Sequence, residues 1–506
     1  MSLFSKQKGL KVLFIASEVA PFVKVGGLGE VMFSLPRALR SLGHDARVMS
    51  PRYLSVDPEK FRLKTVYEGL KIPAGENIDP LICNVRMYDP SDHPDAHSPV
   101  PTYFLENEEY YEKRANVYGY SDDAVRWALL SLGALEFIRT DNAWRPDIIV
   151  ASDWQAGLIS NYIHTIYKDD PLLKDIAVVF SIHNLAFQGM FDHHFVTEMD
   201  YDGGRAEIPS LFDPKLLKLN FMRRAVMFAD VINTVSPTYA QEITTEQYGE
   251  LLHDLLAERR GFLYGILNGI DYTEWNPETD NNLEHKFNAR NISIRQGNKA
   301  VLQQKFNLPQ SEDTFLMSIV SRLADQKGFD LLLESTDSLM QNFDVQLIVL
   351  GTGEGKYINF FNELKERYPQ KVAVHLSFDP ILPRMIYGGA DAVLVPSRYE
   401  PCGLTQMEAM RYGAVPIVRK TGGLADSVDD FNILKGTGNG FVFENYDKYA
   451  LFGTIIRAME VHKHKELWVK IQQEAMGADF SWENSAREYA KIFIKAMEFH
   501  SKKINQ

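Results

Sequence analysis

Short runs of apolar residues recur along the chain, and each ends in polar or charged residues. In the first half these runs include Lys11–Ser17, Asp147–Ala151 and Ile176–Ile182. Unbroken apolar runs of this length predict strands that are buried on both faces of a parallel sheet. A glycine-rich loop and a helical stretch to about Leu42 follow the first run, and Gly43 is placed to end that helix. The pattern predicts units in which a strand, a loop and a helix follow one another.

The second half repeats this pattern more regularly. Its apolar runs predict strands at Phe315–Val320, Val345–Leu350, Val372–Leu376, Ala392–Val395 and Val415–Val418. A helix is expected from about Gly328, and the strands begin at roughly 20- to 30-residue intervals, as βα units require. We therefore predict an α/β fold with two Rossmann-like, doubly wound parallel-sheet domains.

Glycine, asparagine and proline punctuate the segment from Ile266 to Pro277, which predicts the join between the two domains. The predicted domains are residues 1–268 and residues 269–480. From Ser481 onward the pattern is that of a separate amphipathic helix, residues 481–506.

Composition narrows the class of protein. The chain has 506 residues, with 54 Lys and Arg against 67 Asp and Glu, and a net charge of −13. This charge argues against nucleic-acid and anionic-membrane partners. Two cysteines, Cys83 and Cys402, are too few for a disulfide framework and favour a reducing compartment. Lys6 and Lys8 precede a short apolar run, but that run is better explained as a buried strand than as an export signal. We expect a cytoplasmic protein.

The loop Lys24–Gly29 is a first candidate for chemistry. Gly26 and Gly27 let backbone approach a ligand, the helix that follows favours an anion at its start, and Lys24 adds a positive charge. The loop lacks the dinucleotide GxGxxG spacing. A phosphate or sugar site and a tight turn explain it equally well.

Two cations follow the strand at Phe315–Val320. Arg322 and Lys327 would lie at the carboxyl edge of the sheet, where they suit a diphosphate, although a solvated basic loop is the alternative. A further glycine-rich loop, Gly351–Gly355, is explained about as well by tight-turn geometry.

The segment Pro396–Glu408 has the sharpest signal. Glu400 lies in a loop of proline and glycine, where its carboxylate could bind sugar hydroxyls or face a developing positive charge. We expect Gly403, Leu404 and Thr405 to open a helix whose free N–H groups could hold phosphate. Cys402 is interpreted as a packed small residue and Glu408 as a surface carboxylate or a site residue.

Asp153 and His183 each follow a first-half strand and could face a binding cleft, although a single histidine is usually structural. The 13 histidines show no HExxH motif and no metal-binding pattern, so we expect no metal and no cofactor. Aromatic residues gather in one stretch and could pack in the core or stack on sugars. They are Tyr110, Tyr111, Tyr118, Tyr120 and Trp127.

In combination, these motifs resemble the bacterial glycogen synthase and plant starch synthase family, retaining glucosyltransferases of the two-domain GT-B fold. The resemblance extends from Lys11 to about Tyr489. Its marks are Ala16–Phe22, Lys24–Gly29, His183–Gly189, Asn268–Asp271, Trp275–Pro277, Arg322–Gly328, Pro396–Gln406 and Thr421–Asp426.

The resemblance implies glucose transfer from ADP-glucose to the non-reducing 4-hydroxyl of an α-1,4-glucan, with retention of configuration and release of ADP. The first domain would be the acceptor side and the second the nucleotide-sugar side, facing each other across a cleft, and the terminal helix would cross back to the first domain. Arg322 and Lys327 would neutralise the diphosphate, which would explain why no metal is needed.

The resemblance also implies roles for the other motif residues. Those in substrate binding are Lys24, Gly26, Gly27, Asn268, Phe378, Gly403, Leu404 and Thr405. Glu400 would bind glucose hydroxyls, His183 would lie near the anomeric carbon, and Asp153 would orient sugar hydroxyls. The sequence departs from the family's usual pattern in three places: Glu30 stands where aspartate is common, Phe378 stands where tyrosine is frequent, and the residues around Asp153, Ser152 and Gln155, lack the usual histidine.

Three other functions remain open at this point. They are a related transferase that uses UDP-glucose or a small acceptor, a non-catalytic glucan-binding protein, and a Rossmann-type dehydrogenase. The absence of the GxGxxG fingerprint disfavours the dehydrogenase. A front-face displacement is favoured over a covalent glycosyl-enzyme, because Asp153 is the one first-half carboxylate that the motifs supply as a nucleophile.

Overall fold

The computed structural model describes residues 9–93, 98–140, 144–191, 203–204 and 207–504. Lys6 and Lys8, which precede the first apolar run, lie outside these residues. The chain divides into two compact units. Unit 1 comprises residues 1–235, 240–266 and 482–506, and unit 2 comprises residues 236–239 and 267–481. The join predicted from the sequence, between residues 268 and 269, lies two residues after Ile266, where the second segment of unit 1 ends.

Unit 1 is built on a mixed nine-stranded sheet within the described residues, in the order β3-β4-β5-β2-β1-β6-β7-β8-β9. The strands are β1 Lys11–Ile15, β2 Asp45–Pro51, β3 Lys64–Ile72, β4 Leu81–Tyr88, β5 Thr102–Glu106, β6 Ile148–Ser152, β7 Ala177–Ile182, β8 Val231–Thr234 and β9 Leu263–Gly265. The predicted strands β1, β6 and β7 lie side by side in the centre and are parallel. Their residues are almost all buried.

One edge of this sheet differs from the predicted parallel arrangement. Strand β4 pairs antiparallel with both β3 and β5. Strand β3 has no apolar run, because Leu70 and Ile72 are its only buried residues. An edge strand with one solvent-facing side needs few apolar residues, so hydrophobic patterning did not predict β3.

The helices of unit 1 include α1 Gly27–Ser41, α2 Asp123–Thr140, α3 Leu158–His164, α4 Phe221–Phe228 and α6 His253–Glu258. Helix α5, Pro237–Glu242, is divided between the two units. Helix α1 buries Leu28, Val31, Leu35 and Leu39 on one face, which is the spacing of an amphipathic helix. Gly43 follows it with φ of +93°, the left-handed conformation that ends many helices.

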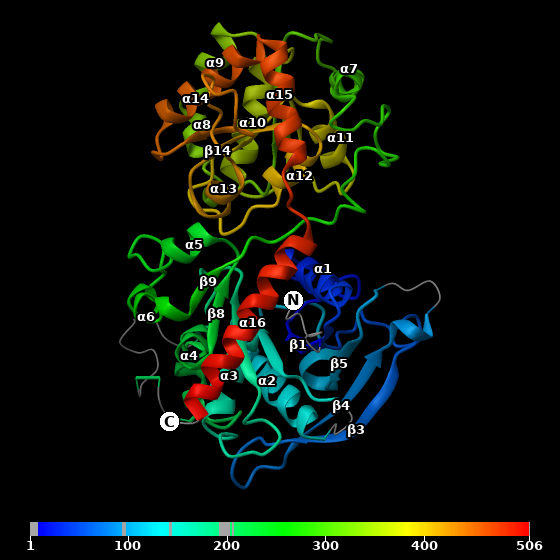
Figure 1. Cartoon of the computed structure of the whole chain (residues 1–506), viewed down its shortest axis with the longest axis vertical. Coiled ribbons are helices and arrows are strands. Elements are labelled where there is room, and N and C mark those ends of the chain that lie inside the picture. The colour runs from blue at the N-terminus through cyan, green and yellow to red at the C-terminus, as the bar shows by residue number, and fades with distance from the viewer. Residues whose placement is uncertain (1–8, 94–97, 141–143, 192–202, 205–206, 505–506) are drawn as a thin grey trace, which may run out of the picture. The chain divides into compact units, whose positions relative to one another are not determined.

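The terminal helix α16, Trp482–Ile504, belongs to unit 1, as the predicted fold required. It contacts α1, β7 and β8 (Figure 1). Tyr489, Phe493 and Ala496 are fully buried at helical spacing. The Tyr489 hydroxyl accepts a 3.0 Å hydrogen bond from the side chain of Asn233 at the end of β8. The amphipathic pattern from Ser481 is therefore the docking face of this helix.

Unit 2 contains a fully parallel six-stranded sheet, all of it in described residues, in the order β12-β11-β10-β13-β14-β15. The strands are β10 Phe315–Val320, β11 Val345–Leu350, β12 Val372–His375, β13 Ala392–Val395, β14 Val415–Arg419 and β15 Phe441–Phe443. The five predicted strands are present, and the short β15 is added at one edge. Their apolar residues form the core of this unit.

The helices of unit 2 are α7 Arg295–Lys305, α8 Asp330–Leu333, α9 Thr336–Asn342, α10 Gly355–Arg367, α11 Leu382–Gly389, α12 Thr405–Arg411, α13 Gly422–Ser427, α14 Lys448–His462 and α15 Lys465–Gly477. The helix expected from Gly328 is two short helices, α8 and α9. The hydroxyls of Ser335 and Thr336 donate to the carbonyls of Leu331 and Leu332, a local bond that bends helices.

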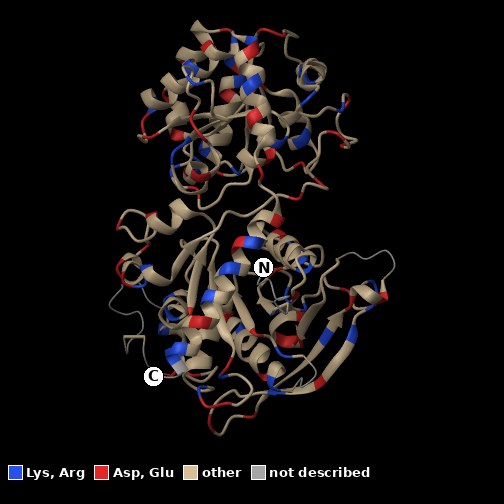
Figure 2. Ribbon diagram, viewed as in Figure 1, with Lys and Arg blue, Asp and Glu red and all other residues tan. Residues whose placement is uncertain are grey.

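Acidic and basic residues are interspersed over both units (Figure 2). Within the described residues, no helix combines the length and apolarity needed to cross a membrane.

Candidate active site

The glycine-rich loop of unit 1 is held by a buried carboxylate. Glu18, 3% exposed, accepts hydrogen bonds at Oε2 from the backbone N–H groups of Val25 (2.6 Å) and Gly26 (2.8 Å). Its Oε1 accepts a hydrogen bond from the Tyr118 hydroxyl. The start of α1 also favours a negative charge at this place. Glu18 thus occupies the Gly26 N–H, which was predicted to be available to a ligand, as well as that of Val25.

The other groups of this loop face outward. A side-chain carbon at Gly27 would meet no atom within 4 Å, whereas at Gly29 it would meet the carbonyl of Val23 at 3.3 Å. The Lys24 side chain is 56% exposed and pairs with Glu30 at 2.5 Å. Lys24 and Gly27 are therefore open to a ligand, while the Gly26 N–H serves the loop itself.

A cavity of about 570 Å³ adjoins this loop within unit 1, and its wall includes Lys24, Ser55, Asn116 and Tyr118. The aromatic residues between Tyr110 and Trp127 were expected either to pack in the core or to stack on sugars, and the structure places them in both settings. Tyr111 and Trp127 are fully buried in the core, whereas Tyr118 lines the cavity. Of this stretch, Tyr118 is the residue best placed to meet a sugar.

Asp153 and His183 lie together at the carboxyl ends of the neighbouring strands β6 and β7. The Asp153 carboxylate accepts hydrogen bonds from the backbone N–H of His183 (2.8 Å) and from that of Asn184. Asp153 itself has φ of +55°, which is uncommon for a residue with a side chain and is found at functional sites. The carboxylate therefore fixes the loop that presents the His183 ring.

The electrostatics of this pair follow from its burial. Removal from water raises the pKa of Asp153 and lowers that of His183, so the imidazole favours its neutral form. The charge of Glu18 acts on both groups and raises the pKa of each. The His183 Nε2 atom is buried, with no hydrogen-bond partner in the described part of the chain. A buried nitrogen without a partner is suited to receive one from a ligand.

In unit 2 the structure brings Lys327 and Glu400 together. Lys327 Nζ lies 2.6 Å from Glu400 Oε2, which also accepts a 2.9 Å hydrogen bond from the Ser397 hydroxyl. Lys327 follows β10 and Glu400 follows β13, and these neighbouring strands are parallel. The two side chains therefore meet at the carboxyl edge of the sheet, where open α/β sheets bind ligands.

Arg322 and Phe378 lie at the same edge of the unit 2 sheet and are exposed. The Arg322 guanidinium lies 3.5 Å from the Gln326 side chain, and the Phe378 ring is 84% exposed after β12. Asn268 is buried and donates its backbone N–H to the Cys402 sulfur, while its side-chain oxygen has no hydrogen-bond partner in the described residues. Burial raises the pKa of Cys402 to about 12, so its thiol is a packing group.

The helix expected at Gly403–Thr405 is present as α12. Gly403 has φ of +71°, Leu404 is the N-cap residue, and Thr405 begins the helix. The Gln406 amide donates to the Gly403 carbonyl at 2.8 Å and stabilises this turn. Leu404 and Thr405 are half-buried.

Tightly packed glycines hold the loops that carry these residues. A side-chain carbon at Gly422 would lie 1.9 Å from the Glu400 carbonyl oxygen, and one at Gly423 would lie 1.9 Å from that of Cys402. The Gly423 N–H also donates to the Glu400 carbonyl at 3.0 Å. In the Gly351–Gly355 loop, Gly353 forms a bridge with Leu323. Tight packing therefore accounts for this loop without a ligand.

Two site residues were missed from the sequence. Glu18 lies within the quoted motif Ala16–Phe22 but was given no role, and Ser397 was not singled out. An acid between a strand and a glycine-rich loop marks Glu18 as a candidate acceptor for loop N–H groups, but its place in the sequence does not give the direction of its side chain.

Comparison with known proteins identifies the family of this chain. A family model for the starch synthase catalytic domain matches residues 11–258, and one for glycosyl transferases group 1 matches residues 301–475. A glycogen synthase of Thermotoga petrophila is 40% identical over 489 residues, covering 96% of this chain and 99% of that protein. One of Desulforudis audaxviator is 39% identical over 500 residues, or 97% of each chain.

Solved structures give the same result. The catalytic domain of starch synthase IV from Arabidopsis thaliana, bound to ADP and acarbose, matches with a TM-score of 0.80 and 30% identity, covering 97% of this chain and 100% of that one. A sucrose-phosphate synthase from Thermosynechococcus elongatus, at 17% identity and a TM-score of 0.57 over 96% of this chain and 98% of that one, shares the fold alone. The chain belongs to the glycogen synthase and starch synthase family of GT-B glucosyltransferases.

Proposed function

We propose that this enzyme transfers glucose from ADP-glucose to the non-reducing 4-hydroxyl of an α-1,4-glucan, with retention of configuration and release of ADP. The observation that carries the proposal is the contact of Lys327 with Glu400 at the carboxyl edge of the unit 2 sheet. An ammonium for the leaving diphosphate and a carboxylate for the sugar stand side by side there. The likeness to a starch synthase bound to ADP and acarbose supports the substrate class.

In this proposal, Arg322 and Lys327 neutralise the diphosphate as the anomeric bond breaks. Charge that develops on a leaving group is stabilised best by cations that are already in place. The backbone at Leu404 and Thr405 adds N–H donors. These groups take the part that a metal ion plays in other transferases, and we propose that the reaction needs no metal and no cofactor.

Glu400 changes partners during the reaction. The ammonium of Lys327 lies 2.6 Å from its carboxylate. A bound diphosphate would attract the ammonium, and the carboxylate would then accept hydroxyl groups of glucose and stabilise the oxocarbenium-like transition state. Ser397 keeps the carboxylate oriented through its 2.9 Å hydrogen bond.

Unit 1 supplies a second set of groups to the reaction. Lys24 and Gly27, which are open, would contact the donor, and the neutral His183 would lie near the anomeric carbon. Asp153 acts as a positioning residue, since its carboxylate already accepts two backbone hydrogen bonds in the loop of His183. A carboxylate engaged in this way is a poor nucleophile, which favours a front-face displacement.

Glu18 and Asn268 would act by positioning, Gly26 and Gly403 by permitting tight turns, and Phe378 by stacking on the base. The cavity beside Tyr118 would take a glucose unit of the glucan. Two buried free cysteines suit a reducing compartment, and we propose a cytoplasmic enzyme without nucleic-acid or membrane partners.

The test is transfer of labelled glucose from ADP-glucose or UDP-glucose into glycogen, with EDTA added at the start of half the reactions. We expect faster transfer from ADP-glucose, undiminished by EDTA, and label that β-amylase releases as maltose. The Glu400→Gln variant is the negative control. Transfer from UDP-glucose alone would replace the proposed donor, and transfer from neither donor would overturn the proposal.

A further inference from the structure

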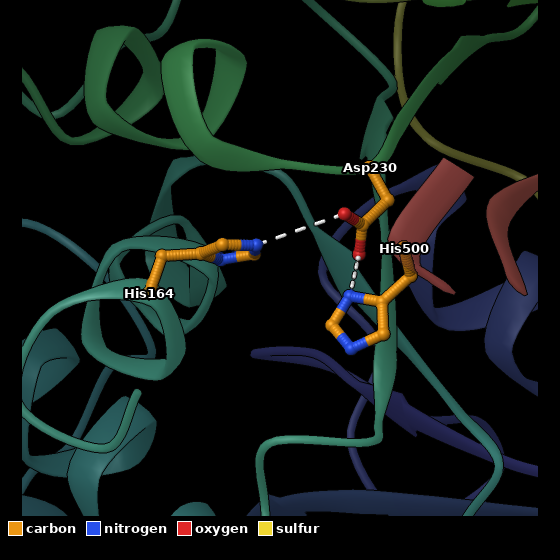
Figure 3. A group of neighbouring side chains, drawn as sticks. All are labelled: His164, Asp230 and His500. Atoms are coloured by element: carbon orange, nitrogen blue, oxygen red, sulfur yellow. Dashed lines mark hydrogen bonds and ion pairs between the residues drawn. The ribbon is translucent and has the colours of Figure 1, made fainter. Parts of the chain in front are cut away.

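Three potential metal ligands from distant parts of the chain meet in unit 1: His164, Asp230 and His500 (Figure 3). His164 ends α3, Asp230 directly precedes β8, and His500 lies in the last turns of α16. Asp230 stands at the amino end of its strand, whereas Asp153 and His183 follow the carboxyl ends of theirs. The cluster therefore lies at the opposite edge of the sheet from the candidate active site. The sequence shows no metal motif here because the ligands are far apart in the chain.

The ligand atoms converge at short range. His500 Nδ1 lies 2.9 Å from Asp230 Oδ2, and His164 Nε2 lies 3.6 Å from Asp230 Oδ1. All three ligand atoms lie within 4.8 Å of one another. The Asp230 side chain is fully buried, that of His500 is 6% exposed, and that of His164 is 19% exposed. Small side-chain movements would bring these atoms to the roughly 2.0–2.2 Å that zinc–ligand bonds require.

Hydrogen bonds to backbone carbonyls fix the tautomer of each ring. His164 Nδ1 lies 2.8 Å from the Ser160 carbonyl, and His500 Nε2 lies 2.8 Å from the Lys174 carbonyl. A carbonyl only accepts, so both of these nitrogens carry hydrogen. In the neutral rings, the nitrogens that face Asp230 then present lone pairs to a carboxylate. Such an arrangement needs a positive charge beside the carboxylate, which a proton on a ring, the Lys503 ammonium or a metal ion between the groups can supply.

The same hydrogen bonds are typical of histidines that bind metals, which donate the other ring N–H to a carbonyl or carboxylate. His164 Nε2 is buried and has no hydrogen-bond partner in the described residues, so one ligand position is already available. The backbone N–H of Val178 donates to Asp230 at 2.9 Å and orients the carboxylate. Two imidazoles and a carboxylate suit Zn²⁺, with water in the fourth position.

We propose that His164, Asp230 and His500 bind one divalent transition-metal ion, with Zn²⁺ as the best match, and that this ion fastens α16 to the core of unit 1. Its role is structural, because Asp153 and His183 lie at the other edge of the sheet. The ion would join α3, the start of β8 and the end of α16, three segments that the chain otherwise connects only over long distances.

Lys503 competes with this ion. Its ammonium lies 3.1 Å from Asp230 Oδ1 and 3.1 Å from the Phe228 carbonyl. The side chain is 38% exposed and stands on the last turn of α16, so it can move into solvent when a metal binds. Removal of this ammonium should therefore strengthen metal binding rather than weaken it.

The experiment measures zinc binding to the full chain after treatment with EDTA and its removal, by calorimetric titration with ZnCl₂ and by thermal unfolding. We expect one equivalent of Zn²⁺ bound per chain and a higher unfolding temperature. His164→Gln should weaken binding at least about 10-fold, and Lys503→Met should strengthen it. Exposed His285 gives the matched control, His285→Gln, which should bind as the wild type does.

His164 is partly exposed at the end of its helix, so His164→Gln should fold even if a His500 variant does not. The proposal would be overturned if the wild type bound Zn²⁺ no more tightly than His164→Gln. It would also be overturned if Lys503→Met bound Zn²⁺ more weakly than the wild type. In either case a protonated His500, with Lys503, would be the counter-charge of Asp230. Because the ligands lie away from the active site, glucose transfer by His164→Gln at 25 °C should stay near the wild-type rate, so this test is independent of the transfer assay.

Discussion

The two units hold their ligand-binding loops in different ways. In unit 1 a carboxylate holds the glycine-rich loop, because Glu18 accepts hydrogen bonds from the N–H groups of Val25 and Gly26 from inside the protein. In unit 2 closely packed glycines hold the loop of Glu400, because Gly422 and Gly423 pack directly on the carbonyls of Glu400 and Cys402. Backbone packing thus holds the loop of Glu400 in unit 2, and the Glu400 side chain remains available to a ligand.

This difference separates two buried acids that look alike in a sequence. Glu18 is 3% exposed and Glu400 is 6% exposed, and each follows a strand that is parallel to both of its neighbours. The partners of Glu18 are backbone N–H groups and a tyrosine, which a ligand does not displace. The partner of Glu400 is the ammonium of Lys327, which a diphosphate can attract. The partners of a buried acid, rather than its burial, indicate whether it acts on substrate.

The largest effect is expected from Lys327→Ala, which removes the partner of Glu400 and a cation of the leaving-group site. Turnover should fall at least about 100-fold, the scale of one lost electrostatic contact in an active site. Steady-state kinetics with ADP-glucose measure this. Lys356→Ala is the control, since Lys356 is 52% exposed in a surface ion pair and its loss should change turnover less than about twofold. Near-normal turnover of Lys327→Ala would remove Lys327 from the catalytic groups.

Gly423→Ala disrupts the glycine packing that holds the loop of Glu400 in unit 2. The added carbon would lie 1.9 Å from the Cys402 carbonyl oxygen, so the loop of Glu400 must shift. We expect a loss of about 1–3 kcal/mol in the free energy of unfolding, as for overpacking, together with lower turnover. Urea unfolding measures the first quantity. Gly453→Ala, on an exposed face of α14 with no atom within 4 Å, should instead stabilise by up to about 1 kcal/mol. Equal effects of Gly423→Ala and Gly453→Ala on the free energy of unfolding would show that glycine packing does not hold the loop of Glu400.

Glu18→Ala removes the carboxylate that holds the glycine-rich loop of unit 1. Two N–H groups would lose their acceptor, and a hydrogen bond to a charged group contributes about 1.5–3 kcal/mol to stability. We expect kcat/KM for ADP-glucose to fall about 10-fold, largely through KM, with a lower unfolding temperature. Glu30→Ala, which removes the half-buried partner of Lys24, is the control. A Glu18→Ala enzyme with unchanged KM would show that the loop keeps its shape without the carboxylate.

The smallest effect is expected from Phe378→Ala, because this ring supports no loop in either unit. If the ring stacks on the base of the donor, KM for ADP-glucose should rise about 2- to 10-fold, the range of aromatic contacts. The unfolding temperature should stay the same, since the ring is 84% exposed. The Leu434→Ala variant, which alters a similarly exposed side chain, should leave KM unchanged. An unchanged KM for Phe378→Ala would exclude the stacking role.

Much of the fold could be predicted from the sequence because buried parallel strands are apolar throughout. The central strands of unit 1 and five of the six strands of unit 2 are such runs. The β3–β4 hairpin could not be found in this way, since β3 faces solvent along most of its length. The break between α8 and α9 depends on hydroxyl groups that bond back to the helix, a choice that periodicity does not reveal.

The candidate site was predictable where its residues follow strands. Lys327 was predicted at the carboxyl edge of the sheet and Glu400 in the loop after the strand that ends at Val395, and the parallel pairing of β10 and β13 brings them together. The role of Glu18 was not predictable from spacing, because the direction of its side chain decides whether it meets a ligand or the backbone. The cluster at Asp230 lies further beyond sequence reasoning, since its members meet only when α16 folds back onto unit 1.

The most direct test compares the same isosteric change at both acids, Glu18→Gln and Glu400→Gln, in transfer from ADP-glucose to glycogen. A glutamine at position 18 still offers an oxygen to two N–H groups, so most of the activity should remain. A glutamine at position 400 cannot supply the negative charge, and kcat should fall at least about 100-fold. Equal losses in the two variants, or a larger loss for Glu18→Gln, would contradict the division between an acid that holds a loop and an acid that acts on the sugar.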